Sequence, residues 1–381
     1  MFLSQLSLRN FRNYRNQEIC FNPDFNIIYG VNGQGKTNLL ESIYYLSVNK
    51  SFRTNRDIDL ANAEGSEFLI KGIFNKGSFS DQLEVNYTQN GQLQLKVNNC
   101  KTDRYANISN YPVVIFSPDD LLLIKEGPSI RRKFINLEAS RLVTSYLKKL
   151  KDYQRVLSQR NYILKDKIGF HRKIELLKPW DQALVFLGTE IIINRVSVLE
   201  SLKIEAAPFF DQMSSSHETL SLDYLSNLTI AGELCDINTD VIREKFFELL
   251  LDKREEELRR GLTLQGPHLD EIKISINGSD ARRYASQGQM RTAVLAIKMG
   301  EVKLFKKLCG HSPLILLDDV FSEFDEVRQE NLISFLKDEP GQCFVTTANR
   351  PDHIMSLLRK RHAIIKIDRG QASHERDRAD H

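Results

Sequence analysis

One glycine-rich motif constrains this chain more than any other feature: it reads Gly30-Val31-Asn32-Gly33-Gln34-Gly35-Lys36-Thr37 and matches G-x-x-x-x-G-K-[ST]. The apolar run 25–29 before it predicts a buried strand, and the apolar residues after it recur at helical spacing. Glycines let backbone N–H groups close around phosphate oxygens, and a helix start adds a favourable partial charge. Lys36 would reach the β- and γ-phosphates, and the Thr37 hydroxyl would bind Mg²⁺. The motif therefore predicts a nucleotide site.

The rest of such a site is expected late in the chain, where the apolar run 314–317 ends in Asp318 and Asp319. An unbroken apolar run is typical of a strand buried on both faces of a sheet. We expect Asp318 to hold Mg²⁺ and Asp319 to orient or deprotonate the attacking water. An apolar run followed by acids is common by itself, so its weight comes from the glycine loop upstream. Because no N-K-x-D pattern specific for guanine occurs, adenine is the favoured base.

A third segment, Ser286-Gln287-Gly288-Gln289, precedes a helical pattern and begins 32 residues before Asp318. A serine and a glycine at a helix start offer a hydroxyl and N–H groups to an anion. The same serine also suits a helix cap, which is the favoured interpretation of the segment in isolation, whereas its position ahead of Asp318 favours the anion site. Both interpretations of Ser286 stay open on these residues alone.

The middle of the chain is expected to form a compact arm of two or three helices. Apolar residues recur at heptad-like spacing from Leu142 to Leu157 and again from Leu184 to Leu202. Residues 125–180 carry fifteen Lys or Arg against five Asp or Glu, whereas 181–260 carry eight against sixteen. The basic half is either a solvated face or a surface that neutralises DNA phosphates. The dense stretch from Lys148 to Lys173 supplies the candidates.

Composition sets the broad class. A chain of 381 residues is long enough for two or three folding units, and 41% apolar with 27% charged residues is ordinary for a globular protein. Its five cysteines are dispersed and odd in number, which indicates reduced thiols and neither a disulfide framework nor a zinc site. No secretory or membrane-spanning segment is recognised, so a cytoplasmic location is expected.

Loop, signature and acidic pair occur in the order found in ABC-type ATPase heads, and further stretches resemble the RecF family of bacterial recombination-repair proteins. These stretches are LSLRNFRNY (6–14), SFRT (51–54), FSPDDLLLIKEGPSIRRKF (116–134) and GPHLDE (266–271). The likeness spans residues 2 to about 350. Departures from the family pattern are Phe324 for Leu, Met290 for Gln and Asn136 for Asp; the last leaves the role of that position open. No convincing switch histidine is found, since His353 falls too late.

The resemblance implies a homodimer that closes over two ATP molecules, because in such heads the signature of one subunit completes the site of the other. Ser286 would contact a γ-phosphate held by the partner copy's loop, and 322–325 would form the dimer seam. Arg53 is a candidate γ-phosphate contact, with an ordinary surface arginine as the alternative. The expected catalytic residues are Lys36 and Asp319, and the expected metal ligands are Thr37 and Asp318. The expected cofactor-binding set is Gly30, Val31, Asn32, Gly33, Gln34, Gly35, Lys36, Thr37, Arg53, Ser286, Gln287, Gly288 and Gln289.

The fold expected from the resemblance is an α/β ABC-type head with a mixed sheet and an inserted helical arm. Its expected parts are 1–124 and 261–367 for the head, 125–260 for the arm and 368–381 for a flexible tail. The implied function is an ATP-dependent, DNA-binding recombination mediator that dimerises on ATP. It would bind duplex DNA and single-strand/duplex junctions near gaps, and be associated with the nucleoid.

That mediator would support recombinase loading with RecR and RecO in repair, replication restart and SOS induction. A weak, DNA-stimulated ATPase is expected, since Asp319 stands where ABC heads usually carry Glu. Two alternatives stay open: the ATP-driving head of a transporter, and a scaffold that binds ATP without hydrolysing it.

Overall fold

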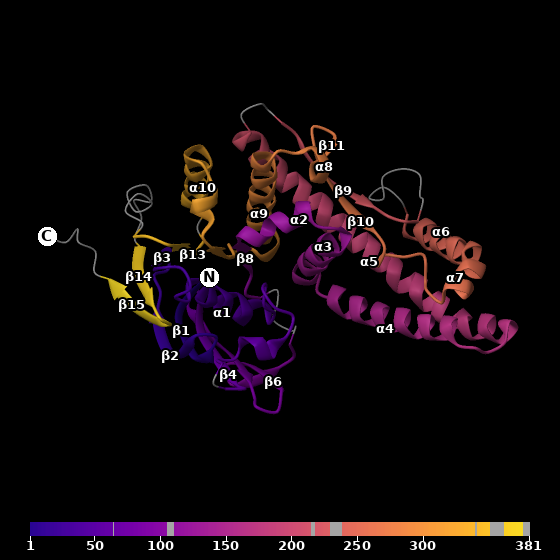
Figure 1. Ribbon diagram of the computed structural model, residues 1–381, viewed down its shortest axis with the longest axis horizontal. Helices are drawn as coiled ribbons and strands as arrows, with labels where there is room; N and C mark the ends of the chain where they lie inside the picture. Colours follow the sequence, from indigo (N-terminus) through magenta and orange to yellow (C-terminus); the bar gives the residue numbers. More distant parts are fainter. Residues whose placement is uncertain are drawn as a thin grey trace. The chain divides into compact units, whose positions relative to one another are not determined.

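The computed structural model describes residues 1–63, 65–104, 110–214, 218–228, 238–339, 341–350 and 362–375. The chain divides into two compact units (Figure 1). The first comprises 1–121, 212–215 and 291–381, and the second comprises 122–211 and 216–290. Residues 261–290, which were expected in the head, therefore belong to the second unit.

A six-stranded sheet forms the centre of the first unit, in the order β15-β14-β3-β13-β12-β8. Its strands are β3 (Phe25–Tyr29), β8 (Val113–Phe116), β12 (Leu314–Leu317), β13 (Cys343–Thr347), β14 (His362–Asp368) and β15 (Gln371–Glu375). All neighbours pair in parallel except β15, which is an antiparallel edge. Strands β3, β8, β12 and β13 are buried almost throughout, which explains their apolar runs.

Both predicted apolar strands, at 25–29 and 314–317, are thus confirmed. The tail expected from residue 368 was wrong in its first part, because residues 371–375 pair with β14. Residues 376–381 lie outside the described residues.

The N-terminal residues of the first unit form a second, wholly antiparallel sheet, in the order β2-β1-β4-β5-β6-β7. Its strands are β1 (Phe2–Phe11), β2 (Tyr14–Cys20), β4 (Phe68–Lys76), β5 (Phe79–Tyr87), β6 (Leu93–Val97) and β7 (Cys100–Thr102). Helix α1 (Lys36–Val48) packs between the two sheets and is buried along nearly its whole length. The hairpin predicted at Asn90-Gly91 joins β5 to β6, with Gly91 at φ 74°.

Two longer helices complete the first unit: α9 (Gln287–Cys309), whose first four residues belong to the second unit, and α10 (Glu326–Asp338). Short 3₁₀ turns lie at Asp57–Leu60, Pro118–Leu121 and Val320–Glu323. The last of these follows the acidic pair directly, so the chain turns sharply as it leaves β12.

The second unit is mainly helical (Figure 1), as expected for the arm. Its helices are α2 (Leu122–Lys125), α3 (Pro128–Leu142), α4 (Tyr146–Lys165), α5 (Phe170–Met213), α6 (Thr239–Asp252), α7 (Arg254–Arg260) and α8 (Ala281–Tyr284). A small sheet, β11-β10-β9, is formed by β9 (Leu220–Leu225), β10 (Glu271–Ile276) and β11 (Ser279–Asp280). The predicted heptad stretch from Leu142 was wrong at its start, since α3 ends at Leu142 and α4 begins at Tyr146.

Helix α5 contains an 18-residue stretch with a mean hydropathy of 1.4, long and apolar enough to cross a membrane by composition. More than half of that stretch is buried within the protein. Leu184, Ile191 and Leu202 are fully enclosed. A long apolar helix whose side chains are covered by its own domain is a core helix.

A buried ion network holds the helices of the second unit together. The Arg160 guanidinium is 0% exposed and donates to Asp181 (2.8 Å), to Glu257 (2.5 Å) and to the Thr263 hydroxyl (2.7 Å). Arg254 adds a second bond to Asp181 at 2.6 Å. These contacts join α4, α5 and α7. Arg160 therefore belongs to the core and not to the DNA candidates among which the charge run placed it.

Replacing Arg160 with Ala should destabilise the protein by about 3–5 kcal/mol, because two carboxylates would remain buried without their cation. Arg155→Ala is the matched control: Arg155 also lies on α4 but is exposed, so its loss should change stability by less than about 0.5 kcal/mol. Urea unfolding followed by circular dichroism measures both. Equal midpoints for the two variants would contradict the assignment.

Candidate active site

The topology of the parallel sheet gathers the predicted acidic residues beside the glycine loop. The loop follows β3, Asp318 follows β12, and β13 lies between these two strands. Because the carboxyl ends of parallel strands meet at one edge, residues 281 positions apart become neighbours. The Thr37 hydroxyl donates to Asp318 Oδ1 at 2.9 Å.

Thr346, next to the last residue of the intervening strand β13, forms hydrogen bonds to both Asp318 and Asp319. Its hydroxyl donates to Asp318 Oδ1 at 2.9 Å and accepts a hydrogen bond from the Asp319 backbone N–H at 2.9 Å. Asp319 itself has φ 52°, a left-handed conformation that is uncommon outside glycine. The side-chain and backbone bonds together fix where each carboxylate leaves the strand.

Two hairpin turns hold the glycine loop from outside. In the β1–β2 hairpin, Asn13 Nδ2 in the turn donates to the Gln34 carbonyl at 2.7 Å, and the hydroxyl of Tyr14, the first residue of β2, donates to the Gly35 carbonyl at 2.9 Å. In the β14–β15 turn, the Gly370 N–H also donates to the Gln34 carbonyl, at 3.0 Å. Gly370 has φ 74°, and a Cβ there would lie 2.2 Å from the Asn13 carbonyl oxygen. The close approach therefore requires glycine.

The Lys36 side chain lies within the curve of the loop. Its Nζ donates to the Gly30 carbonyl at 2.5 Å and to the Val31 carbonyl at 3.3 Å. Burial lowers the pKa of Lys36, while the nearby Asp319 and Asp318 raise it. Val31 at the crest is 71% exposed, so the loop opens toward solvent with its lysine beneath.

The Asp318 carboxyl is unusually easy to protonate. Burial raises its pKa above the ordinary 3.8, the charge of Asp319 adds to the rise, and the hydroxyls of Thr346 and Thr37 oppose it. No group of three or more Asp, Glu, His or Cys suited to a metal occurs in the part of the chain that the structure describes. One carboxylate and one hydroxyl supply two of the six oxygens that Mg²⁺ requires, so phosphate oxygens and water must complete such a site. The residues fit a metal that arrives with a nucleotide.

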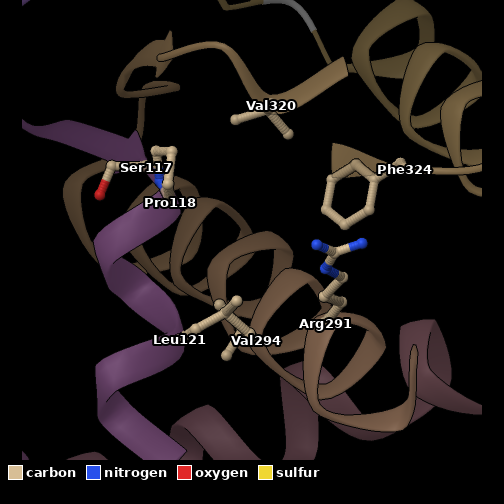
Figure 2. Close-up of a pocket in the computed structure, with 7 residues that line it drawn as sticks. All are labelled: Ser117, Pro118, Leu121, Arg291, Val294, Val320 and Phe324. Carbon is tan, nitrogen blue, oxygen red and sulfur yellow. The ribbon is translucent and has the colours of Figure 1, made fainter. Parts of the chain in front are cut away.

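The segment after Asp319 is organised by local bonds. The Ser322 hydroxyl donates to the Asp319 carbonyl at 2.7 Å, and Asp325 caps α10 by accepting from the Arg328 N–H at 3.0 Å. Phe324 packs beside a small cavity of about 40 Å³ (Figure 2), where the Arg291 guanidinium lies next to its ring. The lining is almost entirely apolar, and the volume is near that of one water molecule, ~30 Å³. This cavity is a packing gap between 117–121, the start of α9 and 320–324, and it is too small for a substrate.

Arg53 lies beside α1 and not in isolation on the surface. Its guanidinium donates to Asn38 Oδ1 at 2.8 Å and lies 3.5 Å from the Glu41 carboxylate. Glu41 is fully buried and accepts two hydrogen bonds from Arg12, at 2.8 and 2.9 Å. Arg53, Arg12 and Asn13 line an open polar crevice next to the glycine loop. The structure therefore places two arginines, Arg12 and Arg53, beside the glycine loop.

Ser286 caps helix α9 in the second unit. Its hydroxyl accepts from the Gln289 N–H at 3.2 Å, and Gln289 Oε1 accepts from the Ser286 N–H at 2.7 Å. This reciprocal pair is a capping box. Ser286 and Gln287 are both exposed. Capping does not exclude the second interpretation, since the outer face of this helix start faces solvent.

Sequence reasoning missed four residues that shape the site: Asn13, Asn38, Thr346 and Gly370. Asn13 lies within LSLRNFRNY, which carried a resemblance but no assigned role. Thr346 ends an apolar strand, and its position between β3 and β12 follows only from the topology. His353, which was set aside as a switch histidine because it falls too late, lies outside the described residues.

Replacing Asp318 with Asn should raise the melting temperature of the nucleotide-free protein at neutral pH, because the variant avoids a buried charge while Oδ1 still accepts from both threonines. The folded-state pKa of Asp318 is raised, so the wild type loses stability as pH rises above 3.8 through that pKa. The advantage of the variant should therefore shrink toward acidic pH, where Asp318 is protonated in both states. Thermal unfolding across pH without Mg²⁺ measures this; a variant less stable at every pH would refute it.

Comparison with known proteins places this geometry in a family. The model of the RecF/RecN/SMC N-terminal domain matches residues 2–372. Curated proteins named DNA replication and repair protein RecF match over nearly the whole chain. The one from Natranaerobius thermophilus is 37% identical, covering 98% of both chains, and the one from Clostridium acetobutylicum is 35% identical, covering 97% of this chain and 99% of its own.

Solved structures agree. A structure of the recombination mediator protein RecF with ATP, described within the RecFOR pathway, has a TM-score of 0.88 at 34% identity and covers 98% of this chain and 99% of its own. A Smc head domain derived from Pyrococcus furiosus, at 16% identity and a TM-score of 0.56, shares the fold alone. The fold is therefore the RecF/SMC-like ATPase head, and the chain belongs to the RecF family of DNA replication and repair proteins.

Proposed function

We propose that this protein is an ATP-dependent recombination mediator that binds DNA as a dimer closed by ATP. The observation that carries the proposal is the cluster of Lys36, Thr37, Asp318 and Asp319 at one edge of the parallel sheet. A cation, a hydroxyl and two carboxylates at a glycine loop match the needs of a magnesium triphosphate. A related structure with ATP supports the choice of nucleotide.

Each residue has a defined task in this proposal. Backbone N–H groups of 30–37 would surround the phosphates, and Lys36 would turn from the loop carbonyls to the β- and γ-phosphates. Thr37 and Asp318 would hold Mg²⁺, which neutralises phosphate charge when bound. Asp319 would orient and deprotonate the attacking water. The crevice lined by Arg12, Asn13 and Arg53 adjoins the loop and would take the rest of the nucleotide.

Completion of the site would come from a second copy of the chain. The exposed start of α9 presents the Ser286 hydroxyl and helix N–H groups, which suit a γ-phosphate. Residues 322–325 would line the seam. ATP would thus act as a clamp: binding closes the dimer on DNA, and slow hydrolysis at Asp319 releases it.

The exposed face of α4 is the proposed DNA surface. Lys148, Lys151, Arg155 and Lys165 are exposed and recur at helical spacing, with Tyr162 among them at 69% exposure. The stripe is about 25 Å long at 1.5 Å per residue. Basic side chains interleaved with an aromatic ring suit backbone contact without base specificity. Structures of relatives described as recombination mediators in the RecFOR pathway support a role in recombination. On the family resemblance alone, the proposal extends to action at gaps and junctions on the nucleoid, with RecR and RecO, in repair and SOS induction.

Lys36→Ala should weaken ATP binding about tenfold or more, since it removes a charge-assisted contact, and should abolish dimerisation induced by ATP. Ser286→Arg should block dimerisation while leaving ATP binding to the monomer intact. Light scattering with and without ATP, together with fluorescent nucleotide titration, measures both. An unchanged dimer fraction in both variants would exclude the shared site.

Replacing Lys148, Lys151 and Arg155 together with Ala should lower the slope of log affinity against log salt by about three units, near 0.9 per phosphate contact. A matched triple variant replaces Lys203, Lys245 and Lys253, which pair with acidic neighbours in the second unit. That control removes the same charge and should leave the slope unchanged. Equal slopes for the two triple variants, measured on gapped duplex, would refute the α4 surface.

A further inference from the structure

A cavity of about 210 Å³ opens within the second unit between α3, α4 and α5. Its volume corresponds to about seven water molecules at ~30 Å³ each. Leu150, Leu157 and Ile191 form apolar sides, and Lys133 stands exposed at its edge. Three of its lining residues are Arg or Lys, and none of the lining residues in the described chain is Asp or Glu.

Arg195 lines this cavity and is only 2% exposed, yet every hydrogen-bond partner it has in the described chain is neutral. The guanidinium donates to Asn136 Oδ1 at 2.9 and 3.0 Å and to the Pro267 carbonyl at 2.6 Å, and also reaches two tyrosine hydroxyls. Asp270 is linked to it through Tyr224, whose hydroxyl donates to that carboxylate at 2.5 Å.

The other buried arginines provide an internal comparison. Five arginines are buried in the described part of the chain, and the four besides Arg195 each contact a carboxylate directly. They are Arg131 with Glu271, Arg141 with Glu138, and Arg160 and Arg254 with Asp181. A buried charge is costly unless it is paired. Arg195 departs from the rule that this protein otherwise follows.

The missing carboxylate has an identifiable place. Asn136 Oδ1 accepts from both Nε and Nη2 of Arg195, which is the edge of the guanidinium that a carboxylate at position 136 would pair with. The amide satisfies the hydrogen bonds but carries no charge, so the compensation of Arg195 comes indirectly from Asp270, which lies beyond Tyr224. Arg132 and Lys133 also line the cavity, so three cationic side chains border space that an anion can enter, and Asp270 is not among the lining residues.

We propose that this cavity binds a phosphate group of a DNA strand. The inference rests on the proposed DNA-binding function and deepens it. Gln154, which lines the cavity, is the neighbour of Arg155 on α4, so the cavity adjoins the stripe assigned to DNA. Its apolar sides suit a deoxyribose beside the phosphate. The exposed basic residues of α4 would contact the DNA backbone at the surface, and the cavity next to them would hold the phosphate and sugar of one nucleotide.

Asn136→Asp tests the cavity without changing its shape. The carboxylate should pair with Arg195, raise the melting temperature and weaken binding to gapped duplex about tenfold, since one charge contact is worth roughly 1.4 kcal/mol. ATP-induced dimerisation should stay unchanged. Asn194→Asp is the matched control: it adds the same charge on α5 next to Arg195 and is not among the cavity residues. Equal affinity of the two variants for DNA would overturn the proposal.

Inorganic phosphate separates the possible sources of the anion. In the Lys36→Ala background, which weakens phosphate binding at the glycine loop, phosphate should raise the melting temperature when residue 136 is Asn but not when it is Asp. If the variant loses this response yet binds DNA like its control, the cavity serves a free phosphate compound and the proposal fails. If instead the α4 triple variant behaves like wild type while Asn136→Asp is impaired, the inference stands and the α4 stripe is refuted.

Discussion

The arrangement of the site depends on one shared hydrogen-bond acceptor. Asp318 Oδ1 receives the hydroxyls of Thr37 and Thr346, and so links the helix after the glycine loop to two neighbouring strands. Burial makes this carboxylate expensive to ionise, and the two hydroxyls offset part of that cost. Keeping Asp318 ionised in a buried place lowers the stability of the folded protein. A site for a cationic ligand requires this, because the ligand binds to a carboxylate that no cation of the protein has already neutralised.

The same reasoning extends to the second unit, where the protein treats its buried arginines unequally. Arg160 is neutralised by Asp181 and Glu257, and it holds helices together. Arg195 is hydrogen-bonded but lacks a direct carboxylate, and it borders open space. Hydrogen bonds fix a guanidinium in place, whereas only an opposite charge removes its field. Whether a buried arginine of the second unit is structural or available to a ligand therefore depends on its contact with a carboxylate, and not on its place in the helices.

The strands 25–29 and 314–317 and the hairpin at Asn90-Gly91 could be predicted from sequence because each depends on a short-range pattern. The neighbours of the glycine loop could not, since Asn13 and Gly370 reach Gln34 from turns on either side of it in the chain. Burial was equally hidden: a run of basic residues made Arg160 look like a surface group, and only the packing of α5 and α7 shows otherwise.

Strand β3, which carries the glycine loop, pairs on one side with β13 and on the other with β14. Both neighbours are supplied by the last forty residues of the chain. Strand β3 therefore pairs only with segments that lie more than 300 residues later in the chain, and contacts of such long sequence separation form late in folding. Without residues 343–368, both edges of β3 would be unpaired, and the glycine loop that follows it would lose the frame that positions it.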